Sequence, residues 1–189
     1  VKAYRGLPEQ TKELFTEDGW LRTGDAGSVD AEGNVKITGR LKELLITAGG
    51  KNVAPVELEF YLKTIPGIGQ AVVVGDRHPY LCALLALDPE NLEAIKQAAG
   101  SSESTMAGLA GCAKVQKFVA GAIETACNAK VARYQTIKKS EILSEEMTVE
   151  GCELTASLKL RRPQILEKHA ALVTKMYEGS GRKPVSTSP

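Results

Sequence analysis

The chain has 189 residues, of which 43% are hydrophobic and 25% are charged, a composition typical of a globular protein with an apolar core. Its 24 basic residues nearly balance its 23 acidic ones, so charge gives no general reason to expect a nucleic acid or an anionic membrane surface as partner. None of its apolar runs approaches the length of a membrane-spanning helix.

The first part of the chain predicts a β-hairpin. Ser28 and Val29 lead into a turn over residues 31–34, in which Gly33 supplies a positive φ, and residues 35–38 alternate between the two faces of a strand. Residues 1–39 are too few to form a core of their own. We therefore interpret them as an appendage, the last strip of a larger upstream domain.

A compact α+β unit is predicted from about residue 41 onward. The stretch LLITAGGKNVAP, residues 44–55, predicts a short apolar strand broken by Gly49 and Gly50. Pro55 suits the first position of a helix, because its missing N–H would be unpaired there in any case. Apolar residues at helical spacing follow it as far as Ile65, and the sequence PGIG then ends the helix.

Three strands are predicted in the larger part of the chain, at residues 70–74, 81–87 and 136–143. Helical patterns separate and follow them. We therefore expect an α+β fold, in which a central, mainly antiparallel three-stranded sheet is flanked by helices. The hairpin and the short upstream strip precede this domain.

The segments between and after the strands predict helices and one loop. Asp88 is expected to cap a helix that continues to residue 98, and apolar residues spaced along 115–126 predict a longer helix. The small, polar residues 98–111 predict a loop between them. One more helix is predicted over residues 165–176, and the Gly-, Ser- and Pro-rich residues 180–189 predict a disordered tail.

Two polar groups near the hairpin have the chemistry of nucleotide binding. Gly24 and Asp25 place a carboxylate beside a glycine, and such a carboxylate can hold both hydroxyls of a ribose. The alternative is an Asx-type turn that opens the hairpin. Arg40 can make a forked contact to a phosphate, or it can belong to a solvated charged turn.

Two further groups lie in the larger domain. Gly49 and Gly50 allow a ligand to approach the backbone closely, because they lack a Cβ; an ordinary loop is the alternative. Lys159 stands between two leucines shortly before a helix, where a compact positive charge could enter a closed site. The alternative for Lys159 is a solvated basic entrance to the helix.

The cysteines and histidines are interpreted as structural. None of the four cysteines is part of a CxxC pair, which favours reduced, partly buried thiols in a cytoplasmic protein over a zinc site or a disulfide framework. These residues are Cys82, Cys112, Cys127 and Cys152. His78 falls in a charged turn and His169 on a helix face. The residues leave open whether a longer protein that contains this chain associates with a membrane.

Three blocks in a fixed order carry a family resemblance. They are YRGLPEQTKELFTEDGWLRTGDAG at residues 4–27, GRLKELLITAGGKNVAPVELE at 39–59 and LTASLKLRRP at 154–163. Together they resemble the last third of the adenylate-forming (AMP-binding) enzymes, the superfamily of acyl-CoA synthetases, luciferases and peptide-synthetase adenylation domains. Within it the chain is most similar to the long- and very-long-chain fatty acyl-CoA synthetases, and ITAGGKNVAP is close to the bubblegum type.

The resemblance implies a role for each polar group. Asp25 would hold the ribose hydroxyls of ATP and of the acyl-adenylate, with Gly24 leaving room for the sugar, and Arg40 would reach the ribose and phosphate. Lys42 matches the hinge at which the small domain pivots. Lys159 matches the lysine that enters the site during adenylation. Gly49, Gly50 and Lys51 match the loop that lines the pantetheine tunnel.

The resemblance also implies a division of the chain. Residues 1–39 would end the large N-terminal AMP-binding domain, residues 40–42 would form the hinge, and residues 43–179 would form a C-terminal lid before the tail at 180–189. The phosphate loop, the Mg²⁺ ligands and the fatty-acid tunnel belong in this family to the upstream domain, so no metal ligand is expected here. The chain's main partner would be its own N-terminal domain.

The implied parent reaction converts fatty acid, ATP and CoA to acyl-CoA, AMP and pyrophosphate with Mg²⁺, and we expect the isolated chain to be inactive. Thr155-Ala156-Ser157 departs from the family's usual Thr-Pro-Thr before the lysine, which weakens the match at Lys159. Two alternatives remain. The lid could belong to another adenylate-forming enzyme, such as an aryl-CoA ligase or a fatty acyl-AMP ligase, or the chain could be a freestanding, non-catalytic binding module.

Overall fold

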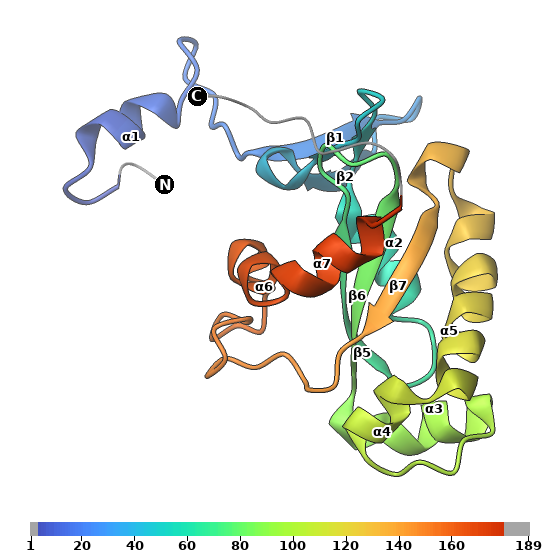
Figure 1. Ribbon diagram of the computed structural model, residues 1–189. Helices are drawn as coiled ribbons and strands as arrows, with labels where there is room; N and C mark the ends of the chain where they lie inside the picture. Colours follow the sequence, from blue (N-terminus) through green and yellow to red (C-terminus); the bar gives the residue numbers. More distant parts are fainter. Residues whose placement is uncertain (1–3, 180–189) are drawn as a thin grey trace. The chain divides into compact units, whose positions relative to one another are not determined.

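The computed structural model describes residues 4–179 and is shown in Figure 1. Its internal contacts divide the chain into two units, Val1–Leu44 and Leu45–Pro189. The predicted disordered tail at 180–189 lies outside the described residues. Among the described residues, no helix has both the length and the apolar character needed to cross a membrane.

The N-terminal unit is built around the predicted hairpin. Strands β1 (Asp25–Val29) and β2 (Val35–Arg40) pair in antiparallel orientation, and Gly33 has a φ of 87° in the turn between them. The Asp30 carboxylate accepts a hydrogen bond from the backbone N–H of Asn34 at 2.8 Å and closes the turn. A short helix, α1 (Pro8–Glu13), precedes the hairpin, and a 3-10 turn, η1 (Leu41–Glu43), follows it.

The C-terminal unit contains the predicted three-stranded sheet, in the order β5-β6-β7. Strand β5 (Ile68–Val74) pairs antiparallel with β6 (Leu81–Leu87), and β7 (Ile137–Ile142) pairs parallel with β6. The α+β fold is confirmed, and the sheet is mixed. The parallel pairing follows from the long helical crossover between β6 and β7, whereas a tight hairpin joins only antiparallel strands.

Helices cover both faces of this sheet (Figure 1). On one face lie α2 (Pro55–Leu62), α3 (Leu92–Ala99) and α5 (Ala113–Ala126), and on the other lie α6 (Arg162–Lys168) and α7 (Ala170–Tyr177). Strand β6 is buried along its whole length. Its residues alternate between two apolar clusters, because successive side chains of a strand point to opposite faces. The core therefore has two layers, one on each side of the sheet.

A short hairpin extends the first layer. Strands β3 (Leu45–Ile46) and β4 (Asn52–Val53) pair antiparallel just before α2. The chain between them contains the predicted interruption at Gly49 and Gly50. Pro55 lies in the first turn of α2, as predicted.

Two predictions about helices were wrong in detail. Residues 98–111 include a helix, α4 (Met106–Gly111), whose start is fixed by Thr105, since the Thr105 hydroxyl accepts a hydrogen bond from the Gly108 N–H at 3.1 Å. The single helix predicted over 165–176 is split into α6 and α7 at His169, where φ is −105° and ψ is 21°. Asp88 caps the 3-10 turn Pro89–Asn91 that leads into α3.

Candidate functional site

The β1–β2 hairpin brings the three predicted nucleotide-binding residues together. Asp25 and Arg40 are directly opposite each other in the register, and Arg40 Nε lies 3.2 Å from Asp25 Oδ1. Gly24 has a φ of 76°, and its carbonyl accepts a hydrogen bond from the Leu41 N–H at 2.8 Å. The Arg40 side chain is 60% exposed, and such exposed ion pairs are weak. A ligand that carries a diol and a phosphate can therefore compete for both side chains.

Lys42 occupies the 3-10 turn Leu41–Glu43, immediately before the point where the two units divide. Its side chain is exposed. The turn is closed by a hydrogen bond from the Leu44 N–H to the Leu41 carbonyl at 3.4 Å. Lys42 is thus the second residue of a tight turn at the unit boundary.

The predicted coenzyme A residues form the tip of the β3–β4 hairpin. Thr47 and Lys51 close this tip, because the Thr47 N–H donates to the Lys51 carbonyl at 3.0 Å and the Lys51 N–H donates to Thr47 Oγ1 at 3.2 Å. Gly50 has a φ of 72°, and a Cβ placed on it would meet no atom within 4 Å. Backbone conformation, rather than lack of space, therefore requires glycine there. The tip leaves its backbone open to a ligand.

The hairpin tip is fixed to the connection between β5 and β6, residues 75–80. Asp76 Oδ1 accepts a hydrogen bond from the Ile46 N–H at 2.9 Å. The Ala48 N–H donates to the carbonyl of His78 at 2.9 Å, and the His78 ring stacks on Tyr177 at 3.6 Å between centroids. Burial lowers the pKa of His78, and the nearby Asp76 opposes this only in part. A neutral, stacked imidazole here supports the interpretation of His78 as structural.

Lys159 ends a tight turn formed by residues 155–159. The Thr155 N–H donates to the Lys159 carbonyl at 2.8 Å, and the Lys159 N–H donates to Thr155 Oγ1 at 3.1 Å. Thr155 Oγ1 also lies 3.1 Å from Ser157 Oγ. The hydroxyl groups at 155 and 157 thus hold the turn although its middle departs from Thr-Pro-Thr. The Lys159 side chain is exposed, and within residues 4–179 its ammonium group forms no ion pair.

The Lys159 turn and the glycine hairpin lie on opposite faces of the sheet. Leu154 and Leu160, on either side of the turn, pack in the cluster that contains Leu84. In contrast, Leu45 and Val53 of the hairpin pack in the cluster of the other face, which contains Leu85. The apolar residues beside the predicted adenylation lysine and those of the hairpin that carries the predicted coenzyme A loop therefore pack against opposite faces of the sheet.

A buried carboxylate that the sequence analysis missed lies at the base of the Lys159 turn. Glu153 is 1% exposed, and its Oε1 lies 3.0 Å from Lys168 Nζ and 3.1 Å from His169 Nε2. Its Oε2 accepts a hydrogen bond from the Thr148 N–H at 3.3 Å. Burial by itself would raise the pKa of Glu153, but the hydrogen bonds from Lys168, His169 and the Thr148 N–H, together with the charge of Lys168, outweigh burial and lower it. The one sequence signal that could have indicated Glu153 is its position directly before LTASLK.

This lowered pKa gives a pH dependence to stability. The unfolded chain binds a proton at Glu153 before the folded chain does, so the stabilisation by its carboxylate is present at neutral pH and is lost as the pH falls through the lowered pKa. We expect the free energy of unfolding of the chain to exceed that of a Glu153→Gln variant near pH 7. Urea titrations at decreasing pH should show this difference shrinking in acid; a difference that is independent of pH would contradict the assignment.

A second buried ion pair joins the two faces of the sheet at its β5 edge. Arg162, the first residue of α6, donates to both carboxylate oxygens of Glu59 on α2, at 2.7 and 2.5 Å. The side chains are only 14% and 8% exposed. The same Glu59 accepts a hydrogen bond from the Val73 N–H at 2.8 Å. This pair, the β5 clamp, fixes the start of α6 three residues after Lys159.

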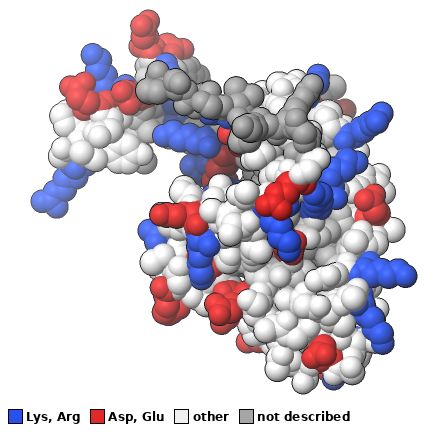
Figure 2. Space-filling view, viewed as in Figure 1, with Lys and Arg blue, Asp and Glu red and all other residues white. Residues whose placement is uncertain are grey.

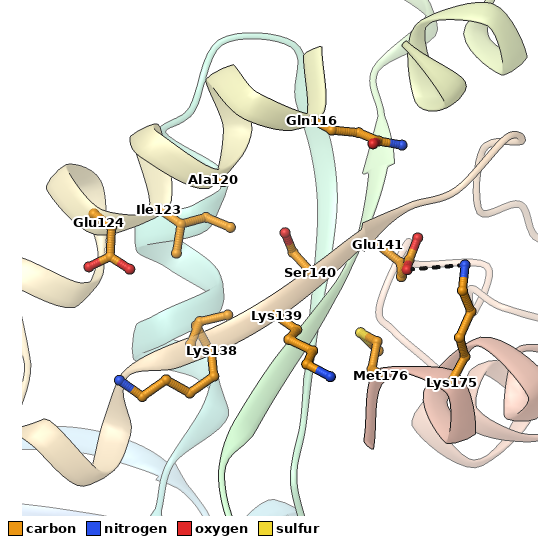
Figure 3. Close-up of a pocket in the computed structure, with 11 residues that line it drawn as sticks. Gln116, Ala120, Ile123, Glu124, Lys138, Lys139, Ser140, Glu141, Lys175 and Met176 are labelled. Atoms are coloured by element: carbon orange, nitrogen blue, oxygen red, sulfur yellow. Dashed lines mark ion pairs between the residues drawn. The ribbon is translucent and has the colours of Figure 1, made fainter. Parts of the chain in front are cut away.

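A pocket of about 420 Å³ runs along the outer edge of β7, between α5 and α7. Lys138, Lys139 and Ser140 of β7 are among its lining residues. Figure 3 shows Lys138 and Lys139 extending from the strand in opposite directions, and Lys175 of α7 paired with Glu141, at 3.7 Å. None of the predicted site residues lines this pocket. Lysines and glutamates both line the pocket, so its lining gives no sign of a strongly charged ligand. Positive and negative side chains are likewise interspersed on the face shown in Figure 2.

The cysteines are free, with Cys82 and Cys127 buried. Burial raises the pKa of Cys127 to about 11, so that thiol stays protonated at neutral pH. Within the part of the chain that the structure describes, no group of three or more His, Cys, Asp or Glu side chains is arranged to hold a metal ion.

The α+β domain with its two turns on opposite faces has the fold of the C-terminal domain of an adenylate-forming enzyme. Residues 42–181 match the family model described as the AMP-binding enzyme C-terminal domain. The chain therefore belongs to that family, which confirms the resemblance found in its motifs.

Curated relatives relate the chain to long-chain fatty acid–CoA ligases. Long-chain-fatty-acid–CoA ligase FadD15 of Mycobacterium tuberculosis is 42% identical over 170 residues, which cover 89% of this chain and 28% of that ligase. Long-chain-fatty-acid–CoA ligase ACSBG1 of Bos taurus is 37% identical over an alignment 205 residues long, gaps included, which covers 98% of this chain and 28% of that ligase. The chain thus spans little more than a quarter of these relatives.

Solved structures share the fold. The adenylation domain of a carboxylate reductase from Mycobacterium chelonae superimposes with a TM-score of 0.75 at 25% identity, over 93% of this chain and 26% of that one. The o-succinylbenzoate CoA synthetase of Bacillus subtilis, solved with ATP and a magnesium ion, gives a TM-score of 0.58 at 26% identity, over 87% of this chain and 28% of that one.

Proposed function

We propose that the chain is the swinging lid of a fatty acyl-CoA synthetase, which converts fatty acid, ATP and CoA to acyl-CoA, AMP and pyrophosphate. The curated relatives are ligases of this kind. The observation that supports the proposal is that the apolar neighbours of Lys159 and those of the Gly49–Gly50 hairpin pack on opposite faces of one sheet. A domain that delivers one group and then another to the same reaction centre needs two such faces.

In the first half-reaction, the fatty carboxylate attacks the α-phosphorus of ATP and pyrophosphate leaves. Negative charge grows on the nonbridging oxygens as the reaction proceeds. The ammonium group of Lys159 is exposed at the end of a hydrogen-bonded turn, where it can meet that charge. Stabilisation that is stronger in the transition state than in the ground state accelerates the step.

In the second half-reaction, a thiol must reach the acyl-adenylate where Lys159 had been. We infer that the lid rotates and presents the opposite face, with the open backbone of Gly50 and the side chain of Lys51 beside the incoming pantetheine. Rigid-body closure of this kind is a common way to assemble a site in stages. The hydrogen bonds from the hairpin to residues 76 and 78 keep the tip rigid during that movement.

The nucleotide would be held by the hairpin of the N-terminal unit. Asp25 would accept hydrogen bonds from the ribose hydroxyls, and Arg40 would contact the ribose and phosphate. Large apolar side chains of this unit are exposed, among them Trp20 at 73%, Val35 at 69% and Val29 at 68%. Exposed apolar side chains in this number favour a packing partner, and we propose that this partner is the enzyme's large N-terminal domain.

Magnesium would act with ATP in the parent enzyme by neutralising phosphate charge. The described residues contain no cluster suited to a metal ion, so we assign none of them to Mg²⁺. The likeness to the adenylation domain of a carboxylate reductase supports a second candidate, a lid that serves adenylation with an acyl acceptor other than CoA.

Assays of the full-length enzyme distinguish the two candidate functions. With fatty acid and ATP it should release pyrophosphate, and addition of CoA should yield acyl-CoA. Pyrophosphate release without any acyl-CoA would favour the second candidate, and no pyrophosphate release with any fatty acid would contradict both. The chain alone is expected to yield no acyl-CoA, because it spans only 28% of the length of a ligase relative.

Lys42→Pro in the full-length enzyme is expected to block the second half-reaction and spare the first. Proline fits the second position of a tight turn such as Leu41–Leu44, so it fixes φ there without abolishing the fold. Thioesterification of supplied acyl-AMP should then fall while acyl-adenylate formation is kept. Lys42→Ala serves as the control, because it removes the side chain and leaves φ free. If Lys42→Pro leaves both half-reactions normal, Lys42 is not the hinge.

A further inference from the structure

We propose that Glu153 is a positioning residue for Lys159: its buried carboxylate fixes the base of the turn that presents the ammonium group. This inference rests on the proposed role of Lys159 in adenylation. Glu153 does not reach the substrate itself, since it is 1% exposed and lies six positions before the lysine. Its effect would pass through the backbone of residues 153–161.

The main chain of Glu153 joins both sides of the Lys159 turn. Its N–H donates to the Thr148 carbonyl at 3.1 Å, and its carbonyl accepts from the Arg161 N–H at 2.8 Å. The next pair inward, Leu154 and Leu160, forms an antiparallel bridge. The turn is therefore the end of a miniature hairpin whose base is Glu153 and Arg161. Any movement of Glu153 would change the direction of the turn.

The side chain of Glu153 anchors that base to the helices behind it. One carboxylate oxygen contacts Lys168 at the end of α6 and His169 at the junction with α7, and the other accepts from the Thr148 N–H. Space around it is tight, because a Cβ added to Gly151 would lie 2.6 Å from Glu153 Oε2. Three donors from two places in the chain, Thr148 and the adjacent residues Lys168 and His169, thus hold a single carboxylate.

Two residues in and next to this hairpin have strained backbone conformations that need such an anchor. Cys152, directly before Glu153, has a φ of 62°, and Leu158, directly before Lys159, has a φ of 57°. A left-handed conformation costs a residue other than glycine roughly 1–2 kcal/mol. Such conformations persist only where the surroundings impose them. Loss of the Glu153 anchor should therefore let both positions relax and move Lys159.

The decisive variant is Glu153→Gln, which keeps the size of the side chain and removes its charge. In the full-length enzyme, acyl-adenylate formation should fall roughly 10- to 100-fold, the cost of misplacing a catalytic group by about an ångström. Thioesterification of supplied acyl-AMP should be unchanged. The matched control is Glu150→Gln, an exposed glutamate three positions away, which should leave both half-reactions unchanged.

A double-mutant cycle distinguishes positioning from general destabilisation. If Glu153 acts through Lys159, adding Glu153→Gln to Lys159→Ala should cause no further loss of adenylation. Equal loss in both half-reactions, or a full further loss in the Lys159→Ala background, would overturn the inference. If Lys159→Ala itself leaves adenylation intact, the proposed function and this inference fall together. If Lys159→Ala lowers adenylation but Glu153→Gln does not, the inference about Glu153 is wrong and the proposed function stands.

A milder variant covers the case in which Glu153→Gln does not fold. Lys168→Met removes one of the two basic partners, whose side chain is 41% exposed, and leaves His169 in place. It should lower adenylation in the same selective way but by a smaller factor. Hydrogen exchange on this variant should show faster exchange at the Leu158 and Arg161 amides than in the unaltered enzyme, with the α5 amides unchanged. Unaltered exchange at both amides would contradict the inference.

Discussion

Lys159→Ala in the full-length enzyme is expected to slow acyl-adenylate formation by about 10²–10³-fold, as does the loss of one oxyanion-stabilising donor in other enzymes. Thioesterification of supplied acyl-AMP should be unchanged, because the proposed mechanism uses the other face of the lid in that step. The turn that carries Lys159 depends on backbone and hydroxyl groups, so the substitution should not alter the fold. Pyrophosphate release and acyl-CoA formation, measured separately, check both parts.

The control for Lys159→Ala is Lys138→Ala. Lys138 is an exposed lysine on β7 that belongs to no predicted site, so its loss should leave both half-reactions unchanged. If Lys159→Ala lowers both half-reactions equally, the lysine does not have the role assigned to it. If it lowers only thioesterification, the two faces of the lid have been assigned in the wrong order.

Arg162→Leu is expected to lower the free energy of unfolding of the chain by about 3–5 kcal/mol, the usual cost of leaving one member of a buried ion pair without its partner. The Glu59 carboxylate is 8% exposed and would lose both hydrogen bonds from the guanidinium group. It could not simply move to water, because it also accepts from the Val73 N–H. Urea denaturation of the chain measures the loss.

Two variants make this second prediction specific. Arg161→Leu removes an exposed arginine one position earlier and should change stability by less than about 0.5 kcal/mol. The pair Glu59→Leu and Arg162→Leu should be no less stable than Arg162→Leu alone, because no unpaired buried charge remains. A single Arg162→Leu variant within about 1 kcal/mol of the unaltered chain would show that the β5 clamp is not a major source of stability.

Local pattern was enough to predict most elements of the fold. Continuous apolar runs gave the positions of β5 and β6, and Pro55 marked the start of α2 because its chemistry suits only a few positions. Composition misled at residues 98–111, where small and polar residues favoured a loop although Thr105 caps a helix. Periodicity alone also missed the break at His169, since the apolar spacing continues across it.

Candidate site residues could be predicted only where they lie in short motifs. Asp25, Arg40 and Lys159 were predicted because each belongs to a block of characteristic spacing. The residues that hold those blocks in place were missed, because their partners are far away in the chain. Arg162 and Glu59 are separated by 103 positions, and Asp76 reaches back 30 positions to Ile46. Pairings of this range depend on the folded sheet and leave no local pattern.

Lysine labelling of the full-length enzyme tests the central claim most directly, because Lys159 and Lys51 are both exposed and lie in turns whose apolar neighbours pack on opposite faces of the sheet. An amine-reactive reagent followed by mass spectrometry would measure both lysines in two states of the enzyme. With ATP and a non-reactive fatty-acid analogue, Lys159 should be protected and Lys51 labelled; with a stable acyl-adenylate analogue and CoA, the pattern should be reversed. Protection of both lysines in the same state would contradict a lid that presents its faces in turn.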